Sequence, residues 1–165
     1  MSLYEPFVPP LSHSLKAMSR ILDKAEAHAS ARKIEPSVLL GSRLYPDMWP
    51  LLRQVQAACD MTRRGALRLT GQEPPSVPDT ETTLGELKAR IASTVAILEG
   101  LSPADFKGAE DRTISFKAGP RDMHFTGTAY LHSWIIPNVY FHLTTAYAIL
   151  RHNGVELGKP DFLGG

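Results

Sequence analysis

Four long segments of the chain carry apolar residues at spacings of three and four, which places those residues on one face of an α-helix. The expected helices cover residues 9–35, 47–70, 83–101 and 126–153, and stretches rich in proline and glycine separate them. A helix with one apolar face must bury that face against another element. The pattern therefore predicts an all-α fold, a four-helix bundle, in a single domain over residues 1–165.

Proline and glycine mark the expected helix ends. Pro9 and Pro10 are predicted to lie in the first turn of the first helix, because proline is tolerated there. Asp47 is the expected N-cap of the second helix, and this start leaves Pro50 in its first turn. Gly71 is the expected stop of the same helix.

A small hairpin is predicted between the third and fourth helices. Thr83 and Glu86 have capping-box spacing at the start of the third helix. Residues 113–125 then alternate between apolar and polar side chains around a central Gly-Pro, which indicates a hairpin or an extended segment before the last helix. Pro137 lies inside the last helix and is expected to kink it.

Charge and cysteine content argue against several classes of protein. The 18 Lys and Arg residues face 17 Asp and Glu residues, and the net charge of +1 is small for a nucleic-acid-binding protein. The basic cluster Arg63, Arg64 and Arg68 is interpreted as a solvated helix face. Cys59 is the single cysteine, so no intrachain disulfide can form, and an inert buried thiol is favoured over a reactive one. No signal peptide is recognisable at the N-terminus, so we expect a cytoplasmic protein.

The segment Gly127–Leu150 contains no Asp, Glu, Lys or Arg and is long enough to be tested as a membrane span. It does contain His132, Asn138 and His142, which are costly in lipid unless they are paired. A helix buried on most sides within a soluble bundle is the favoured interpretation, and membrane insertion is the alternative.

Polar residues on otherwise apolar helix faces indicate where a site could lie. Asn138 and His142 are four residues apart and share one face of the last helix, and Gln54 interrupts an apolar line on the second helix. Buried polar groups need partners, so these three side chains are expected to meet. His132 and Tyr140 are further candidates for the same pocket. The cluster could fix helix register, or it could form a pocket for a small molecule.

The C-terminal pattern resembles the last helix of the DinB/YfiT-like superfamily of bacterial helical bundles. That helix carries His-x-x-x-His, followed nine residues later by Arg in a Leu-Arg-x-x-Gly ending. Here Asn138 and His142 stand at the two histidine positions, and Arg151 and Gly154 keep the ending. Gln54 falls at the place of a third histidine in the superfamily's second helix.

Almost the whole chain is similar to an uncharacterised DinB-related family, a domain of unknown function. The segments that carry this resemblance are residues 21–28, 44–48, 54–59, 86–90 and 141–147. The resemblance implies a metal triad of three histidines, whereas this chain offers two amides and a single imidazole at the triad positions. Neutral amides are poor ligands for Zn or Ni, so we expect no metal cofactor, with a Zn or Ni site that recruits His132 as the alternative.

Three functions stay open on the sequence. The favoured one is a bundle that binds a small molecule or a partner at the degenerate triad position without catalysis. The resemblance also implies a metal-dependent transferase acting on low-molecular-weight thiols, and a structural or regulatory homodimer is the third alternative.

Trp49 and Trp134 are predicted to be core aromatics, and the apolar tail at 158–163 is predicted to fold back onto the bundle or onto a neighbouring subunit.

Overall fold

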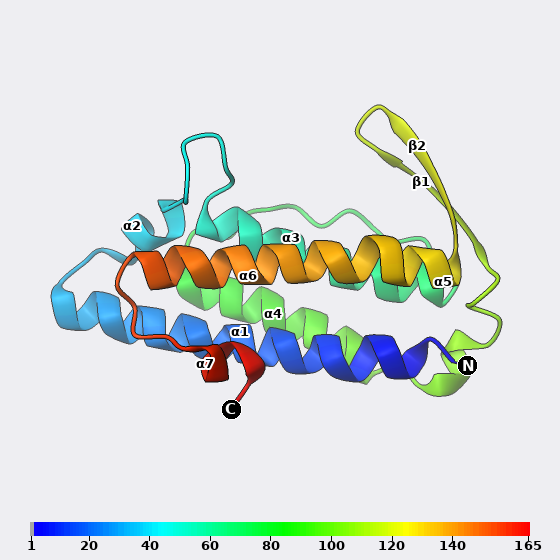
Figure 1. The fold of residues 1–165 in the computed structure, drawn as a ribbon, viewed down its shortest axis with the longest axis horizontal. Coiled ribbons are helices and arrows are strands. Elements are labelled where there is room, and N and C mark those ends of the chain that lie inside the picture. The colour runs from blue at the N-terminus through cyan, green and yellow to red at the C-terminus, as the bar shows by residue number, and fades with distance from the viewer. Residues whose placement is uncertain (1) are drawn as a thin grey trace.

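Four long helices lie side by side in the computed structural model, which describes residues 2–165 (Figure 1). Along the chain the elements are α1 (Tyr4–Arg32), α2 (Pro36–Gly41), α3 (Leu51–Leu69), α4 (Leu84–Glu99), η1 (Pro103–Phe106), β1 (Thr113–Ala118), β2 (Arg121–Thr126), α5 (Gly127–Tyr130), η2 (Leu131–Ile135), α6 (Ile136–His152) and α7 (Lys159–Leu163). The predicted helical bundle, with a hairpin before its last long helix, is confirmed.

The long helices enclose one apolar core. Helix α3 packs against α4 and α6, and α1 packs against the same two helices from the other side. The segment 70–83 has no regular structure and runs back along the bundle, so that α4 points in the same direction as α3 (Figure 1). This crossover brings residues of the 70–83 segment beside the first half of α3, where the candidate site lies.

Helix α1 begins earlier than predicted. It starts at Tyr4, so Pro9 and Pro10 lie inside the helix and not in its first turn. Each proline removes one backbone hydrogen bond. The helix continues through them because Leu3 and Phe7 extend its apolar face into the core, where they are 4% and 0% exposed. Burial of these side chains outweighs the local preference of proline.

Helix α3 begins later than predicted. Pro50 is its extended N-cap and Leu51 its first residue, whereas Asp47 lies in the preceding turn. Proline disfavours the helical conformation of the residue before it, so a helix cannot readily pass through Trp49. The carbonyl of Trp49 is therefore left outside the helix and free to accept a hydrogen bond from a side chain.

The other end of α3 and the start of α4 are as predicted. Gly71 has a φ of +83° after the last turn of α3, a conformation that favours glycine. Thr83 accepts from the backbone N–H of Glu86, and the Glu86 carboxylate accepts in return from the backbone N–H of Thr83. This reciprocal pair satisfies two donors that the first turn of a helix leaves open.

The hairpin stands at one end of the bundle (Figure 1). Strands β1 and β2 pair antiparallel from Thr113 opposite Thr126 to Ala118 opposite Arg121. Phe116 packs against Tyr130 and Trp134, which ties the hairpin to the last helix. A Cβ at Gly127 would lie 1.7 Å from a backbone oxygen of residue 109, so only glycine allows this close approach.

Pro137 disturbs the last helix through a π turn. Helix α5 continues through η2 into α6 as one rod in Figure 1, and η2, immediately before α6, has π geometry. Proline has no N–H to donate to the preceding turn, and a π turn is one way in which a helix accommodates the change. The kink expected at Pro137 stays a prediction, because a π turn is a change of local helix geometry and not a bend of the helix axis.

The C-terminal tail folds back onto the bundle as predicted. Helix α7 packs against α1, and the Phe162 ring meets the Tyr147 ring of α6 edge-on at 5.8 Å. Lys24 pairs with Asp161 at 2.5 Å. Within residues 2–165 no helix is long and apolar enough to cross a bilayer.

Candidate functional site

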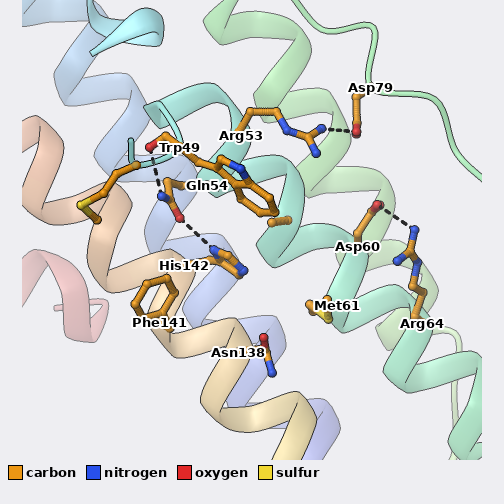
Figure 2. A pocket seen from close by; sticks show the side chains of 12 residues that line it. Trp49, Arg53, Gln54, Asp60, Met61, Arg64, Asp79, Asn138, Phe141 and His142 are labelled. Carbon is orange, nitrogen blue, oxygen red and sulfur yellow. Dashed lines mark hydrogen bonds and ion pairs between the residues drawn. The ribbon is translucent and has the colours of Figure 1, made fainter. Parts of the chain in front are cut away.

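A cavity of about 520 Å³ lies between the first half of α3 and the middle of α6 (Figure 2). The residues that line it are Met48, Trp49, Arg53, Gln54, Ala57, Asp60, Met61, Arg64, Asp79, Asn138, Phe141 and His142. Its size is within the range of small-molecule sites, and its lining combines aromatic and thioether groups with a few polar ones.

A chain of hydrogen bonds runs from Trp49 through Gln54 to His142. The Gln54 amide Nε2 donates to the Trp49 carbonyl at 3.1 Å, and His142 Nδ1 lies 2.8 Å from Gln54 Oε1. Both side chains are buried, with Gln54 2% and His142 7% exposed. The sequence-based expectation that these two residues meet is confirmed.

These contacts fix the tautomer of the imidazole. Because Gln54 Nε2 faces a carbonyl, its Oε1 must face His142, and an oxygen can only accept. His142 Nδ1 is therefore the protonated nitrogen, and in the neutral ring Nε2 carries a lone pair. Burial lowers the pKa of His142 below its ordinary value, so the neutral ring is favoured.

His142 Nε2 faces the cavity in Figure 2, away from the nitrogen that bonds Gln54. It has no hydrogen-bond partner among residues 2–165. The atom is not among the fully buried unpaired atoms of the described residues, so it is open to the cavity, where water or a ligand can donate to it. The site therefore presents a hydrogen-bond acceptor to whatever enters it.

Asn138 lines the cavity one helical turn before His142. Its Nδ2 donates to the carbonyl of Trp134 at 2.7 Å, so its Oδ1 is a second acceptor. Figure 2 shows this oxygen turned toward the imidazole side of the cavity. Asn138 does not bond to Gln54 or His142, so the predicted meeting of all three side chains is only partly right.

Two other candidates lie elsewhere. His132 is exposed and does not line the cavity, because the helical phase carries it to the solvent side of the last helix. Tyr140 lies on a different face of α6, where its hydroxyl is 3.3 Å from Ser14 Oγ of α1. Neither residue belongs to the site.

The Trp49 indole forms part of the cavity wall. Its ring stacks on the His142 ring, with centroids 5.7 Å apart and planes 10° from parallel, and the Arg53 guanidinium lies 5.2 Å from the indole centroid. Trp49 is 49% exposed and Phe141 is 58% exposed. The prediction that Trp49 is a core aromatic is therefore wrong, whereas Trp134 does pack against the core.

An ion cluster supports the α3 side of the cavity. The Arg90 guanidinium of α4 lies 2.7 Å from Asp60, 3.0 Å from Asp79 and 2.9 Å from Glu81. Burial alone lowers the pKa of Arg90, but its hydrogen bonds to Glu81 and Asp60 outweigh that effect and raise the pKa. Arg53 also pairs with Asp79, so a single carboxylate of the 70–83 segment links the cavity wall to α4.

The basic residues of α3 are not simply a solvated face. Arg63 is 7% exposed, donates to the Pro75 carbonyl at 2.8 Å and lies 3.7 Å from Asp60. Arg68 lies over the Phe116 ring at 4.3 Å. That prediction is wrong for these two residues, because the crossover and the hairpin cover this side of the helix.

Cys59 is buried on the core side of the same helix. Burial raises the pKa of its thiol to about 12, so the group stays protonated and unreactive at neutral pH. The expected inert thiol fits this environment.

Several lining residues were missed in the sequence. Arg53, Asp60 and Arg64 are spaced seven and four apart and flank Gln54 on one face of α3, so helical periodicity could have placed them. Asp79 could not be found in this way, because the crossover that brings it to the cavity has no periodicity.

The fold and this site define a DinB-type helical bundle. The chain is similar to a solved structure titled as a DinB family member protein from Shewanella denitrificans, with 50% sequence identity and a TM-score of 0.92 over 99% of this chain and 92% of that one. More narrowly, the chain belongs to the family of the domain of unknown function DUF1993, whose model matches residues 3–163. The resemblance expected from the sequence is confirmed. A comparison with curated proteins gives no match.

The residues at the triad positions do not fit a transition metal. Gln54 uses its oxygen for His142 and its nitrogen for a carbonyl, so it has no free ligand atom directed at the cavity. His142 Nε2 and Asn138 Oδ1 remain, and one imidazole with one amide falls short of the three protein ligands typical of catalytic zinc. Within residues 2–165 no group of three or more His, Cys, Asp or Glu side chains could hold a metal ion.

Proposed function

We propose that the protein binds a small molecule in the cavity between α3 and α6 without transforming it. The observation that carries this proposal is the lone pair of His142 Nε2, which is held toward a cavity of about 520 Å³ and has no partner in the described part of the chain. A ligand with an N–H or O–H group can donate to that acceptor in place of water.

The supporting bonds favour a fixed binding site. Gln54 is itself oriented by the Trp49 carbonyl, so the imidazole cannot exchange its two nitrogens without breaking both bonds. A receptor group that is oriented before the ligand arrives loses little entropy on binding. The aromatic wall at Trp49 and Phe141 supplies apolar contact area beside the polar end.

The alternative, a metal-dependent thiol transferase, has less support in these residues. Such an enzyme needs a cation or an equivalent group that stabilises a thiolate. The bonds already made by Gln54 leave only His142 Nε2 and Asn138 Oδ1, which are too few ligands for that role. We also propose a cytoplasmic location and a homodimeric state, both of which are compatible with the binding role.

The test compares two histidine variants. In His142→Asn the shorter amide reaches the position of Nδ1, so it still donates to Gln54 but removes the Nε2 acceptor. His152→Asn, at the exposed end of the same helix, is the matched control. Small phenols, aromatic amides and aromatic alcohols are titrated against each protein by saturation-transfer NMR.

We expect a compound that binds wild-type protein to bind the control equally well and to bind His142→Asn about tenfold more weakly. A difference of about tenfold is the usual effect of losing one hydrogen bond in a binding site. The bound compounds should be recovered unchanged after long incubation. Equal affinity of a compound for all three proteins would contradict the proposed site. Chemical conversion of a bound compound would show that the protein is an enzyme and would contradict the proposal of binding without catalysis.

A further inference from the structure

The cavity wall across from His142 carries an excess of positive charge. Figure 2 shows Asp60 and Arg64 on this side. The ion cluster joins four guanidinium groups to three carboxylates, namely Arg53, Arg63, Arg64 and Arg90 with Asp60, Asp79 and Glu81. One positive charge is therefore left without a full counter-charge.

Arg64 is where a ligand can reach that charge. Its guanidinium is 3.4 Å from Asp60 Oδ2, whereas Arg90 holds the same carboxylate at 2.7 Å and Arg63 lies near it at 3.7 Å. Three cations thus share Asp60, and Arg64 is the most exposed of them, with 39% of its side chain accessible. Arg64 lines the cavity, and Arg63 and Arg90 do not.

The space between the two polar ends is bounded by apolar and aromatic groups. Trp49 and Phe141 line the cavity with exposed ring surface, and Met48 and Met61 add thioether groups. Figure 2 shows Met61 between His142 and Arg64, whereas Phe141 lies on the far side of His142. Aromatic and thioether surfaces of this kind bind flat rings well. The cavity therefore has an acceptor with the Trp49 ring beside it, a thioether from Met61 in the middle and a cation at the other end.

We propose that the ligand is a small aromatic carboxylic acid that also carries an O–H or N–H donor. The donor bonds to His142 Nε2, the ring lies against Trp49 and Met61, and the carboxylate pairs with Arg64. This inference rests on the proposed function, because it names the ligand class of the same cavity.

Three matched probes separate these contacts. 4-Hydroxyphenylacetate has the ring, the donor and the carboxylate. Its methyl ester lacks the negative charge, and 4-methoxyphenylacetate lacks the donor. Compounds this small bind with a Kd on the order of millimolar even when they fit well, so saturation-transfer NMR and calorimetry at high ligand concentration suit the measurement.

We expect 4-hydroxyphenylacetate to bind wild-type protein about five- to tenfold more tightly than either analogue. Arg64→Gln should lower the affinity for the acid to that for the ester and leave the ester unaffected. Arg151→Gln, an exposed arginine on α6 away from the cavity, is the matched control and should change neither value.

The outcomes distinguish this inference from the function on which it rests. If the ester binds as tightly as the acid, and binding of both is weakened by His142→Asn, the ligand class is wrong and the binding site stands. If Arg64→Gln leaves the preference for the acid intact, the assignment of the carboxylate to Arg64 is wrong. If no probe binds in a way that depends on His142, both proposals are wrong.

Discussion

Replacing Gln54 by leucine tests the hydrogen-bond chain that orients His142. The substitution keeps the volume of the side chain roughly constant but removes the acceptor for His142 Nδ1 and the donor to the Trp49 carbonyl. Each lost bond that leaves a buried partner unsatisfied costs about 1–3 kcal/mol. The two bonds together cost about 2–6 kcal/mol, and the apolar leucine returns about 1 kcal/mol by its own burial, so the net loss is about 1–5 kcal/mol.

Urea denaturation followed by circular dichroism measures this loss, and an unchanged slope with urea concentration indicates that the unfolded state is unaffected. Each kcal/mol of this loss should lower the melting temperature by about 2–4 °C in a chain of this length. Gln72→Leu, at an exposed position in the crossover, is the control and should change stability by no more than about 0.5 kcal/mol.

Long-range ¹H–¹⁵N NMR of the histidine rings provides the second readout. In wild-type protein His142 should show a protonated Nδ1 and an unprotonated Nε2, and in Gln54→Leu the two tautomers should mix. A stability loss below about 1 kcal/mol together with an unchanged tautomer would refute the reasoning, because it would mean that Gln54 does not hold the ring.

Three further predictions concern pH, metal binding and the tail. Burial lowers the pKa of His142 in the folded protein, so the unfolded chain binds a proton there at a higher pH than the folded chain does. The free energy of unfolding should therefore fall as the pH drops from the ordinary value of 6.5 to the lower folded pKa. Urea titrations at a series of pH values should show that His142→Asn removes this part of the fall. The double variant Gln54→His with Asn138→His should place three imidazoles around the cavity and bind Zn or Ni stoichiometrically by metal analysis; uptake no greater than wild type would show that the three positions do not converge. Phe162→Asp should cost about 1–2 kcal/mol in urea denaturation, because a carboxylate replaces a ring packed on Tyr147; unchanged stability and unchanged assembly state would contradict the docking of the tail.

The sequence was most informative where one helix face repeats regularly. The capping box at Thr83 and the glycine stop at Gly71 are local signals and were predicted correctly. Helix starts were harder, because tertiary burial decided them. The burial of Phe7 extended α1 through two prolines, and the restriction that Pro50 places on Trp49 delayed α3.

The site was predictable only in part, for a related reason. Helical phase brought Gln54 and His142 together, since each interrupts the apolar face of its own helix. Helical periodicity alone did not show that Tyr140 faces α1. Consecutive residues of a helix point about 100° apart, so Tyr140 can face one helix while its neighbour Phe141 lines the cavity. Asp79 reaches the cavity through a crossover whose path no local pattern encodes.

Asp79 of the crossover forms one ion pair with Arg53 and another with Arg90, and these two pairs should differ in their sensitivity to ionic strength. The outer pair, with 39% and 32% of its side chains exposed, is open to screening by dissolved ions, whereas Arg90 has only 6% of its side chain exposed. We therefore expect concentrated salt to loosen the rim of the cavity while the crossover stays attached to α4. Ligand affinities measured in dilute and in concentrated buffers should then differ even though the unfolding midpoint barely moves.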